Sequence, residues 1–274
     1  MYLSIRAPDH LGDGVMALPA VTALAAAHRV QIHAPRWGVE LYQGFSVVPA
    51  GHPPEGEVGV LLKPSFGAAW RWRHLPRRVG LNMNHRGILL TDPVPPPPGH
   101  RRAGFAAVAG KLGVEVEGLP CYLPRGQARP LPQPYVGLNP WSPSPTVRWP
   151  RFRELALRLR ASGQAVVFFC GPGEEEEVAA LAEGFPLLAG LKLPDFAATL
   201  EGCRLLISND SGAAHFAAAC GVPVRMIHGS TAPEWTGAGE GIEAERLWCQ
   251  PCYRKSCPIG VRCITRVEVE AVLR

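Results

Sequence analysis

The chain alternates short apolar segments with amphipathic or alanine-rich ones, as strands and helices do when they follow one another. In the first half, this pattern predicts strands at 3–6, 30–34 and 58–62 and a helix over 15–27. Strands that alternate with helices form parallel sheets through right-handed crossover connections. We therefore expect an α/β domain in the first half.

The same alternation restarts after a proline-rich stretch that can sustain neither a helix nor a central strand. We interpret residues 126–134 as a linker between an N-terminal domain, 1–125, and a C-terminal domain, 135–274, with a cysteine-rich tail and a terminal helix. In this second half we predict strands at 135–139, 165–170, 205–207 and 222–227 and a helix over about 150–161. Two such units suggest paired Rossmann-like domains that bind ligands in a cleft.

Composition supports a globular protein. Of the 274 residues, 47% are hydrophobic and 19% are charged, which excludes a disordered chain. No apolar run is long enough to span a membrane and Met1 leads directly into a strand, so we expect a cytoplasmic protein. The net charge of +5 suits an anionic ligand without implying nucleic acid. Four lysines among 28 basic residues and 29 prolines are typical of a thermophile.

Two loops carry candidate chemistry. The first follows the first strand and contains Asp13 between Gly12 and Gly14. Its carboxylate would lie where α/β sheets bind ligands and could serve as a general base, although Asp13 could also be only the N-cap of the helix predicted from residue 15. The second is the stretch SNDSGAAHF, where free N–H groups of a helix beginning after Ser211 could bind phosphate. His215, one turn later, could reach the same anion or could be an ordinary core histidine.

Other segments are open to two readings. Arg148, in a loop with the hydroxyls of Ser144 and Thr146, could pair with a diphosphate. The run of glutamates at 174–177, at another predicted helix start, could compensate a helix dipole or take part in catalysis, and we interpret it as dipole compensation. The basic segment 70–78, with its interleaved tryptophans, could bind an anionic glycan, a lipid surface or single-stranded nucleic acid, or could be a solvated helix end.

Four of the eight cysteines fall within fifteen residues: Cys249, Cys252, Cys257 and Cys263. The spacing is compact enough for a tetrahedral zinc site. Zinc would normally be favoured over disulfides in a cytoplasmic protein, but thermophiles are an exception. The residues leave a metal, disulfides or free thiols open, and in each case the expected role is structural.

Taken together and in order, these loops resemble those of the glycosyltransferase family that contains the ADP-heptose:lipopolysaccharide heptosyltransferases. The resemblance covers nearly the whole chain. It lies in the segments 11–20, 64–66, 77–80, 89–92, 148–150 and 171–174, and above all in Asn209-Asp210-Ser211-Gly212-x2-His215-x3-Ala219-x-Gly221-Val222-Pro223. The four-cysteine tail is similar to one found in some members.

The resemblance implies a GT-B architecture of two Rossmann-like α/β domains facing each other across a cleft, and an inverting transfer that needs no metal cofactor. It implies that Asp13 is the general base and that the donor, an ADP-sugar, is held by Asn209, Asp210, Ser211, Gly212 and His215, with Arg148, Thr146 and Ser144 as further candidates. The acceptor, a cell-envelope glycan or lipid, would lie on the N-terminal side. The candidates for acceptor binding are Lys63, Ser65, Arg71, Arg73 and Arg78.

The sequence departs from the family at two positions: Trp141 stands where members often have a glycine, and Val147 stands where they often have a phosphate-binding lysine. A catalytically weak nucleotide- or glycan-binding protein is therefore an alternative. A nucleotide-sugar epimerase is a further alternative, because it has the same architecture. The segment 70–78 further predicts peripheral contact with the inner face of the membrane.

Overall fold

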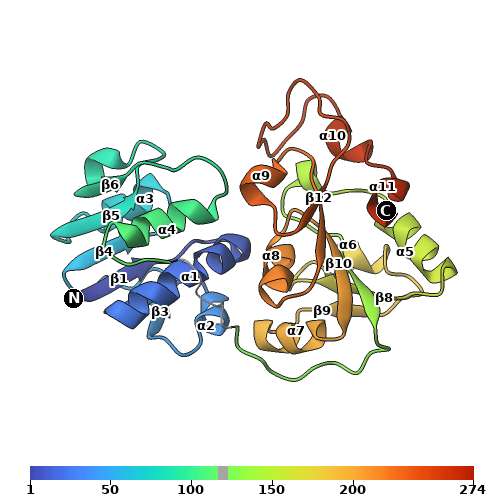
Figure 1. Cartoon of the computed structure of the whole chain (residues 1–274), viewed down its shortest axis with the longest axis horizontal. Helices are drawn as coiled ribbons and strands as arrows, with labels where there is room; N and C mark the ends of the chain where they lie inside the picture. Colours follow the sequence, from blue (N-terminus) through green and yellow to red (C-terminus); the bar gives the residue numbers. More distant parts are fainter. Residues whose placement is uncertain (117–122) are drawn as a thin grey trace. The chain divides into compact units, whose positions relative to one another are not determined.

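The computed structural model describes residues 1–116 and 123–274, and the chain divides into two compact units, Met1–Pro124 and Arg125–Arg274. Each unit is built on its own six-stranded sheet (Figure 1). All strand pairs in both sheets are parallel, as alternating strands and helices predict.

Unit 1 has the strand order β3-β2-β1-β4-β5-β6. The chain leaves β1 for one side of the sheet and β4 for the other, so the order reverses between these two neighbours, which is where α/β folds bind ligands. Its elements are β1 (Tyr2–Arg6), α1 (Leu11–Ala27), β2 (Arg29–Ala34), α2 (Gly38–Leu41), β3 (Val47–Pro49), β4 (Val58–Leu61), α3 (Phe66–Arg71), β5 (Arg77–Leu81), η1 (Gly87–Leu89), β6 (Asp92–Val94) and α4 (Arg102–Gly110).

Unit 2 repeats this order as β12-β11-β10-β7-β8-β9, with the reversal between β7 and β10. Both units therefore have the Rossmann strand order. The elements of unit 2 are β7 (Tyr135–Asn139), η2 (Pro145–Val147), α5 (Phe152–Ala161), β8 (Ala165–Cys170), α6 (Glu175–Ala179), β9 (Leu187–Ala189), α7 (Leu193–Leu200), β10 (Cys203–Asn209), α8 (Gly212–Ala219), β11 (Val224–Ile227), α9 (Pro233–Thr236), β12 (Glu240–Ile242), α10 (Arg262–Thr265) and α11 (Val269–Leu273).

The first helix begins earlier than its apolar pattern predicts. Helix α1 starts at Leu11, with His10 at its N-cap, so Asp13 lies inside the first turn and the interpretation of Asp13 as the N-cap is wrong. The two glycines beside Asp13 are helical and make no tight turn. A Cβ at Gly14 would lie 2.4 Å from Cη2 of Trp37, so this glycine serves close packing of the Trp37 ring on the helix.

Several short edge strands escape prediction, and two predicted elements start too early. Strands β3, β9 and β12 have three residues each, too few to show a period. Strand β11 begins at Val224 because the N–H of Val222 still bonds to Ala217 O of the preceding helix and Pro223 has no N–H to give. Helix α5 begins at Phe152, not at Pro150, with Arg151 at its N-cap.

The segment interpreted as a linker lies against α7 in the second unit. The N–H of Gly126 bonds to Pro194 O at 2.9 Å, that of Gln127 to Asp195 Oδ1 at 2.9 Å, and that of Arg129 to Thr199 Oγ1 at 3.1 Å. These three bonds satisfy backbone donors that a proline-rich stretch cannot pair in a ladder. Among the residues that the structure describes, no helix combines the length and the apolar composition of a membrane span.

Candidate functional site

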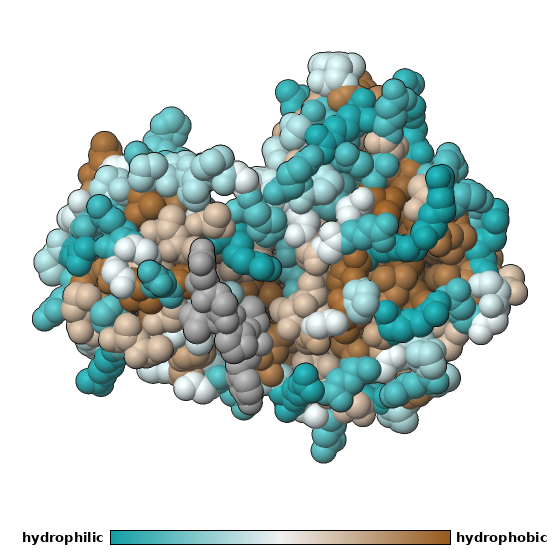
Figure 2. All heavy atoms as spheres, viewed as in Figure 1, coloured by the Kyte–Doolittle hydropathy of each residue, from teal (hydrophilic) through white to brown (hydrophobic). Residues whose placement is uncertain are grey.

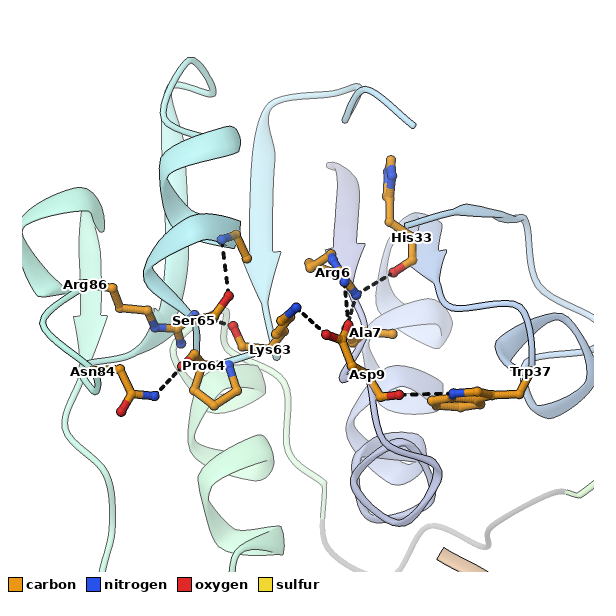
Figure 3. A network of polar contacts seen from close by, with 11 residues as sticks. Arg6, Ala7, Asp9, His33, Trp37, Lys63, Pro64, Ser65, Asn84 and Arg86 are labelled. Atoms are coloured by element: carbon orange, nitrogen blue, oxygen red, sulfur yellow. Dashed lines mark hydrogen bonds and ion pairs between the residues drawn. The ribbon is translucent and has the colours of Figure 1, made fainter. Parts of the chain in front are cut away.

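In unit 1, a polar network crosses the point where the strand order reverses. Asp9, just after β1, accepts a hydrogen bond from Arg6 Nη2 at 2.6 Å and pairs with the ammonium group of Lys63, which follows β4 (Figure 3). Burial raises the pKa of the Asp9 carboxyl, but the bonds from Lys63 and Arg6 outweigh it and hold the pKa below its ordinary value. The charged Asp9 thus ties the loops after β1 and β4 together.

Buried Arg86 holds the loop after β4 from beneath. Its guanidinium is fully buried and donates to Leu81 O at 2.8 Å and Leu61 O at 3.2 Å. It also donates to Lys63 O at 2.6 Å (Figure 3). Burial lowers the pKa of Arg86 to about 10, so it stays charged. Sequence analysis missed this residue, because a lone arginine in a polar loop carries no signal of burial.

Asn84 holds the same loop by a second contact. Its side-chain amide donates to Pro64 O, and both Asn84 and the following His85 adopt left-handed backbone conformations, with φ of 53° and 58°. Two consecutive non-glycine residues in this region are uncommon and are found where surrounding structure fixes a loop. The loop that carries Lys63 is therefore pinned from two sides.

Asp13 lies in the first turn of α1, at the same edge of the sheet. Only 7% of the residue is exposed, and its Oδ2 atom lies 2.9 Å from Nη2 of Arg101, just before α4. A carboxylate in the first turn is also stabilised by the helix dipole. Arg101 therefore holds the Asp13 carboxylate in one orientation at the start of the helix.

The five candidates for acceptor binding have different surroundings. Ser65 caps α3 by accepting a bond from the N–H of Ala68 at 3.2 Å, and Arg78 donates to the carbonyls of Leu75 and Leu89, so both have structural partners. Lys63 is engaged by Asp9. Arg71 and Arg73 are exposed on or beside α3, and Arg73 lies over the Trp70 ring at 4.2 Å.

The basic segment 70–78 combines a buried and an exposed tryptophan, so neither a continuous stacking surface nor a fully solvated helix end describes all of it. Trp72 is 1% exposed and belongs to the core, where it packs edge-on against His33, whereas Trp70 is 51% exposed. The two rings differ because they stand two residues apart on α3 and its C-cap and so face different directions. One of the two tryptophans is therefore available to a partner.

In unit 2, hydroxyls and an amide meet between β7 and β10. Ser211 Oγ lies 2.9 Å from Ser208 Oγ and donates to Asn139 Oδ1 at 3.2 Å. Because the Ser211 hydroxyl is used in this way, it does not cap α8. The first N–H groups of α8, which begins at Gly212, thus have no side-chain cap from Ser211 and suit an anion.

Three of the residues that we predict to bind the nucleotide-sugar donor lie at or near the start of α8. Asp210 accepts a bond from Thr236 Oγ1 at 2.9 Å, which fixes its carboxylate beside α9. His215 is 6% exposed, on the buried part of α8. Asn209 is fully buried, and its amide accepts from the N–H of Trp149 at 3.0 Å and donates to Pro140 O at 2.5 Å. We infer that Asn209 positions the loop after β7.

The loop after β7 contains the remaining residues that we predict to bind the nucleotide-sugar donor. Arg148 lies 4.8 Å from the Trp141 ring, donates to Ser142 O at 2.5 Å and pairs with Glu177 at 2.5 Å. Val147 is 4% exposed and packs in the core, which explains an apolar residue there. The Thr146 hydroxyl is buried and bonds to Ser144, Ser230 and Arg254 O.

The four tail cysteines line one cavity of about 20 Å³, together with Thr146 and Ser230. The seven cysteines that the structure describes all have free thiols, and Cys121 lies outside the described residues. Among these residues, no three His, Cys, Asp or Glu side chains are arranged to hold a metal ion. In the view of Figure 2, the surface around the position of α10 is mostly hydrophilic. The metal, the disulfides and the free thiols that the sequence leaves open at these four cysteines all stay predictions.

Comparison with known proteins identifies relatives along most of the chain. Residues 110–261, more than half of it, match the model of the family described as glycosyltransferase family 9 (heptosyltransferase). Lipopolysaccharide heptosyltransferase 1 of Pseudomonas aeruginosa is 28% identical over an alignment that covers 90% of this chain and 84% of the relative.

Solved structures agree on the fold. The Escherichia coli ADP-heptose lps heptosyltransferase II superposes with a TM-score of 0.74 at 21% identity, covering 100% of this chain and 98% of the other. The E. coli heptosyltransferase WaaC with ADP-2-deoxy-2-fluoro heptose gives a TM-score of 0.72 at 17% identity, with the same coverage of both chains. The architecture is GT-B, as the resemblance of the loops implies.

Proposed function

Because this chain belongs to glycosyltransferase family 9, the heptosyltransferase family, we propose that it transfers a heptose from an ADP-sugar to a lipopolysaccharide-type glycan or lipid of the cell envelope. Unit 1 serves as the acceptor domain and unit 2 as the nucleotide-sugar domain. The observation that supports this proposal is a buried Asp13, paired with Arg101 at the carboxyl edge of the sheet of unit 1.

Asp13 acts as the general base. An acceptor hydroxyl that attacks the anomeric carbon must lose its proton, and a carboxylate held by Arg101 can accept it. Attack on the face opposite the leaving ADP inverts the configuration at that carbon. Lys63, tied to Asp9, presents a cation near the same edge for an anionic group of the acceptor.

The leaving diphosphate gains charge as the glycosidic bond breaks. The N-terminus of α8 stabilises that charge by its backbone N–H groups and its dipole, with His215 as a further donor and Asp210 as the contact to sugar hydroxyls. Preorganised dipoles of this kind perform the task that a divalent cation performs in other transferases. Transfer is therefore expected to continue in the presence of EDTA.

Replacement of Asp13 tests the proposal. In Asp13→Asn the side chain keeps its shape but cannot accept the proton, so kcat should fall about 10²- to 10⁴-fold while the Kd for ADP stays unchanged. Product formation by mass spectrometry and ADP binding by calorimetry measure the two quantities. Asp92→Asn, which removes a carboxylate paired with Arg77 at the sheet edge, is the matched control. Full turnover in Asp13→Asn would exclude this assignment of the base.

We also propose that unit 1 touches an anionic membrane surface, where a lipid-linked acceptor resides. Phe66 and Trp70 on α3 are 43% and 51% exposed and stack with ring centroids 6.4 Å apart, and Ile88 on the adjoining η1 is 87% exposed. Exposed Arg71 and Arg73 add positive charge beside these apolar groups. Aromatic groups flanked by arginines suit the interface of a membrane with anionic lipids.

Co-sedimentation with vesicles tests this surface. Binding to vesicles with anionic phosphatidylglycerol should exceed binding to neutral phosphatidylcholine and should fall several-fold in Trp70→Ala, because the ring no longer enters the interface. Trp248→Ala removes a tryptophan that is 91% exposed in unit 2 and should leave binding unchanged. Equal losses in the two variants would argue against a surface in unit 1.

A further inference from the structure

Three polar residues stand in a row at the carboxyl edge of the sheet of unit 2. Strands β10, β11 and β12 are neighbours, with Asn209 paired with Ile227 and Ile227 with Ile242. Asp210, His228 and Glu243 each follow directly on these paired residues. The N–H of His228 still bonds to Ile242 O at 2.8 Å, so the parallel arrangement continues past the strand ends.

His228 is the middle member of this row, and only one of its two ring nitrogens has a hydrogen-bond partner among the described residues. The residue is fully buried, and its Nδ1 atom shares a hydrogen bond with Thr231 Oγ1 at 3.2 Å. Its Nε2 atom is buried with no hydrogen-bond partner among the described residues, and so is Oε2 of Glu243. Buried ring nitrogens are normally paired, so an unpaired one here is a costly feature that packing alone does not explain.

The charges around the ring are mostly negative. Asp210, Glu243 and Glu234 favour a proton on His228, whereas Arg246, which pairs with Glu234 at 2.6 Å and Glu243 at 2.9 Å, opposes it. Burial is the largest influence and lowers the pKa of His228 below its ordinary value. The ring is neutral at pH 7, and acidification adds a charge within the field of the Asp210 carboxylate.

We propose that His228 is a positioning residue for Asp210: neutral, it leaves the carboxylate to accept hydrogen bonds from the donor sugar, and protonated, it draws the carboxylate away from the sugar. This inference rests on the proposed function, in which Asp210 contacts sugar hydroxyls. The affinity that the sugar adds to ADP therefore falls as the pH falls, and His228 sets the pH of the change.

Calorimetry with ADP-heptose and with ADP separates this effect from other titrations. Both ligands carry the diphosphate and would contact His215 in the same way. The ratio of their two Kd values therefore isolates the contribution of the sugar. The second phosphate ionisation of ADP, which ADP-heptose lacks, is corrected by its known pKa. In the wild type, the advantage of ADP-heptose over ADP should shrink at least threefold as the pH falls from 7.5 to below the lowered pKa of His228. In His228→Phe and His228→Gln it should be independent of pH.

Two further variants sharpen the test. Glu243→Gln removes a carboxylate that favours the proton on His228, so the transition should move to lower pH. His33→Gln alters a fully buried histidine of unit 1 and should keep the pH dependence of the wild type. Thermal melting establishes that each variant is folded, and Glu243→Gln serves as the readout if the two His228 variants do not fold.

The outcomes are distinguishable. A wild-type ratio that does not change with pH, an unchanged pH dependence in a folded His228 variant, or no shift in Glu243→Gln would overturn the role of His228. Absence of binding of both ADP-heptose and ADP to the wild type would overturn the proposed function, and this inference with it.

Discussion

Buried polar side chains in this protein hold backbone loops in place more often than they face a ligand. Arg86 binds three carbonyls beneath the loop after β4, and Asn209 bonds to the backbone on both sides of the loop after β7. A buried donor left unpaired costs about 1–3 kcal/mol, so such residues tolerate only one loop conformation. The positions of Lys63 and Arg148 thus depend on neighbours that never need to touch substrate.

Cys257 should be the most reactive of the described cysteines whose thiol pKa values are shifted. Backbone N–H groups of Ile259, Val261 and Gly260 lower the pKa of its half-exposed thiol, whereas burial raises the pKa of Cys203 to about 11 and that of Cys220 to about 12. The thiolate is the reactive form, so iodoacetamide should modify Cys257 before Cys203 and Cys220 at pH 7. Peptide mapping by mass spectrometry after timed quenching measures the order.

A chelator separates this prediction from metal binding. If zinc occupied the four tail cysteines, Cys257 would be protected until the metal was removed, and elemental analysis would find about one ion per chain. Modification of Cys257 no faster than that of Cys203, in reduced and chelator-treated protein, would contradict the predicted reactivity.

At the scale of elements, close packing of α1 on the segment after β2 depends on one glycine. In Gly14→Ala, the gain in helix propensity of about 1 kcal/mol competes with a methyl group 2.4 Å from Cη2 and 2.8 Å from Cζ3 of Trp37. The Trp37 ring is held by a bond from Nε1 to Asp9 O at 3.1 Å, so it cannot move without a loss. We expect a net destabilisation of about 1–3 kcal/mol by urea unfolding.

Gly110→Ala provides the opposite case in the same unit. Gly110 ends α4, and no atom lies within 4 Å of the position that its Cβ would take. The substitution should therefore stabilise the protein by up to about 1 kcal/mol, from helix propensity alone. Equal effects of the two substitutions would show that the Trp37 contact does not limit position 14.

At the scale of the whole molecule, each unit has its own sheet and its own core. One hydrophobic cluster of unit 2 runs from Val136 to Val272 and includes no residue of unit 1. Units with separate cores can unfold in separate transitions. ADP at 100 times its Kd should stabilise only unit 2, by about 2.7 kcal/mol, which corresponds to about 5–10 °C for its 150 residues, Arg125–Arg274.

Differential scanning calorimetry of the full chain measures this effect. Gly14→Ala assigns the transitions, because it should lower only the transition of unit 1. An ADP-induced shift confined to the transition that Gly14→Ala lowers would place the nucleotide in unit 1 and contradict the assigned roles of the two units.

The sequence alone predicted much of this protein because its strongest signals are local. The apolar run at 165–170 predicted β8 with correct bounds, and the order of the loops from Asp13 to His215 predicted the family and its GT-B fold. Apolar period, helix signals and loop motifs each depend on residues near one another in the chain, so they can be read without the fold.

The tertiary structure decided the features that depend on distant partners. Trp70 and Trp72 look alike in sequence, but only the fold buries one and exposes the other. The partners of Asp13, Asp9 and Arg86, and the row of Asp210, His228 and Glu243, come from segments that parallel pairing and packing bring together. Burial of a polar or amphipathic side chain, and its pairing with a distant partner, depend on the whole arrangement of the chain, and the local sequence contains no signal for either.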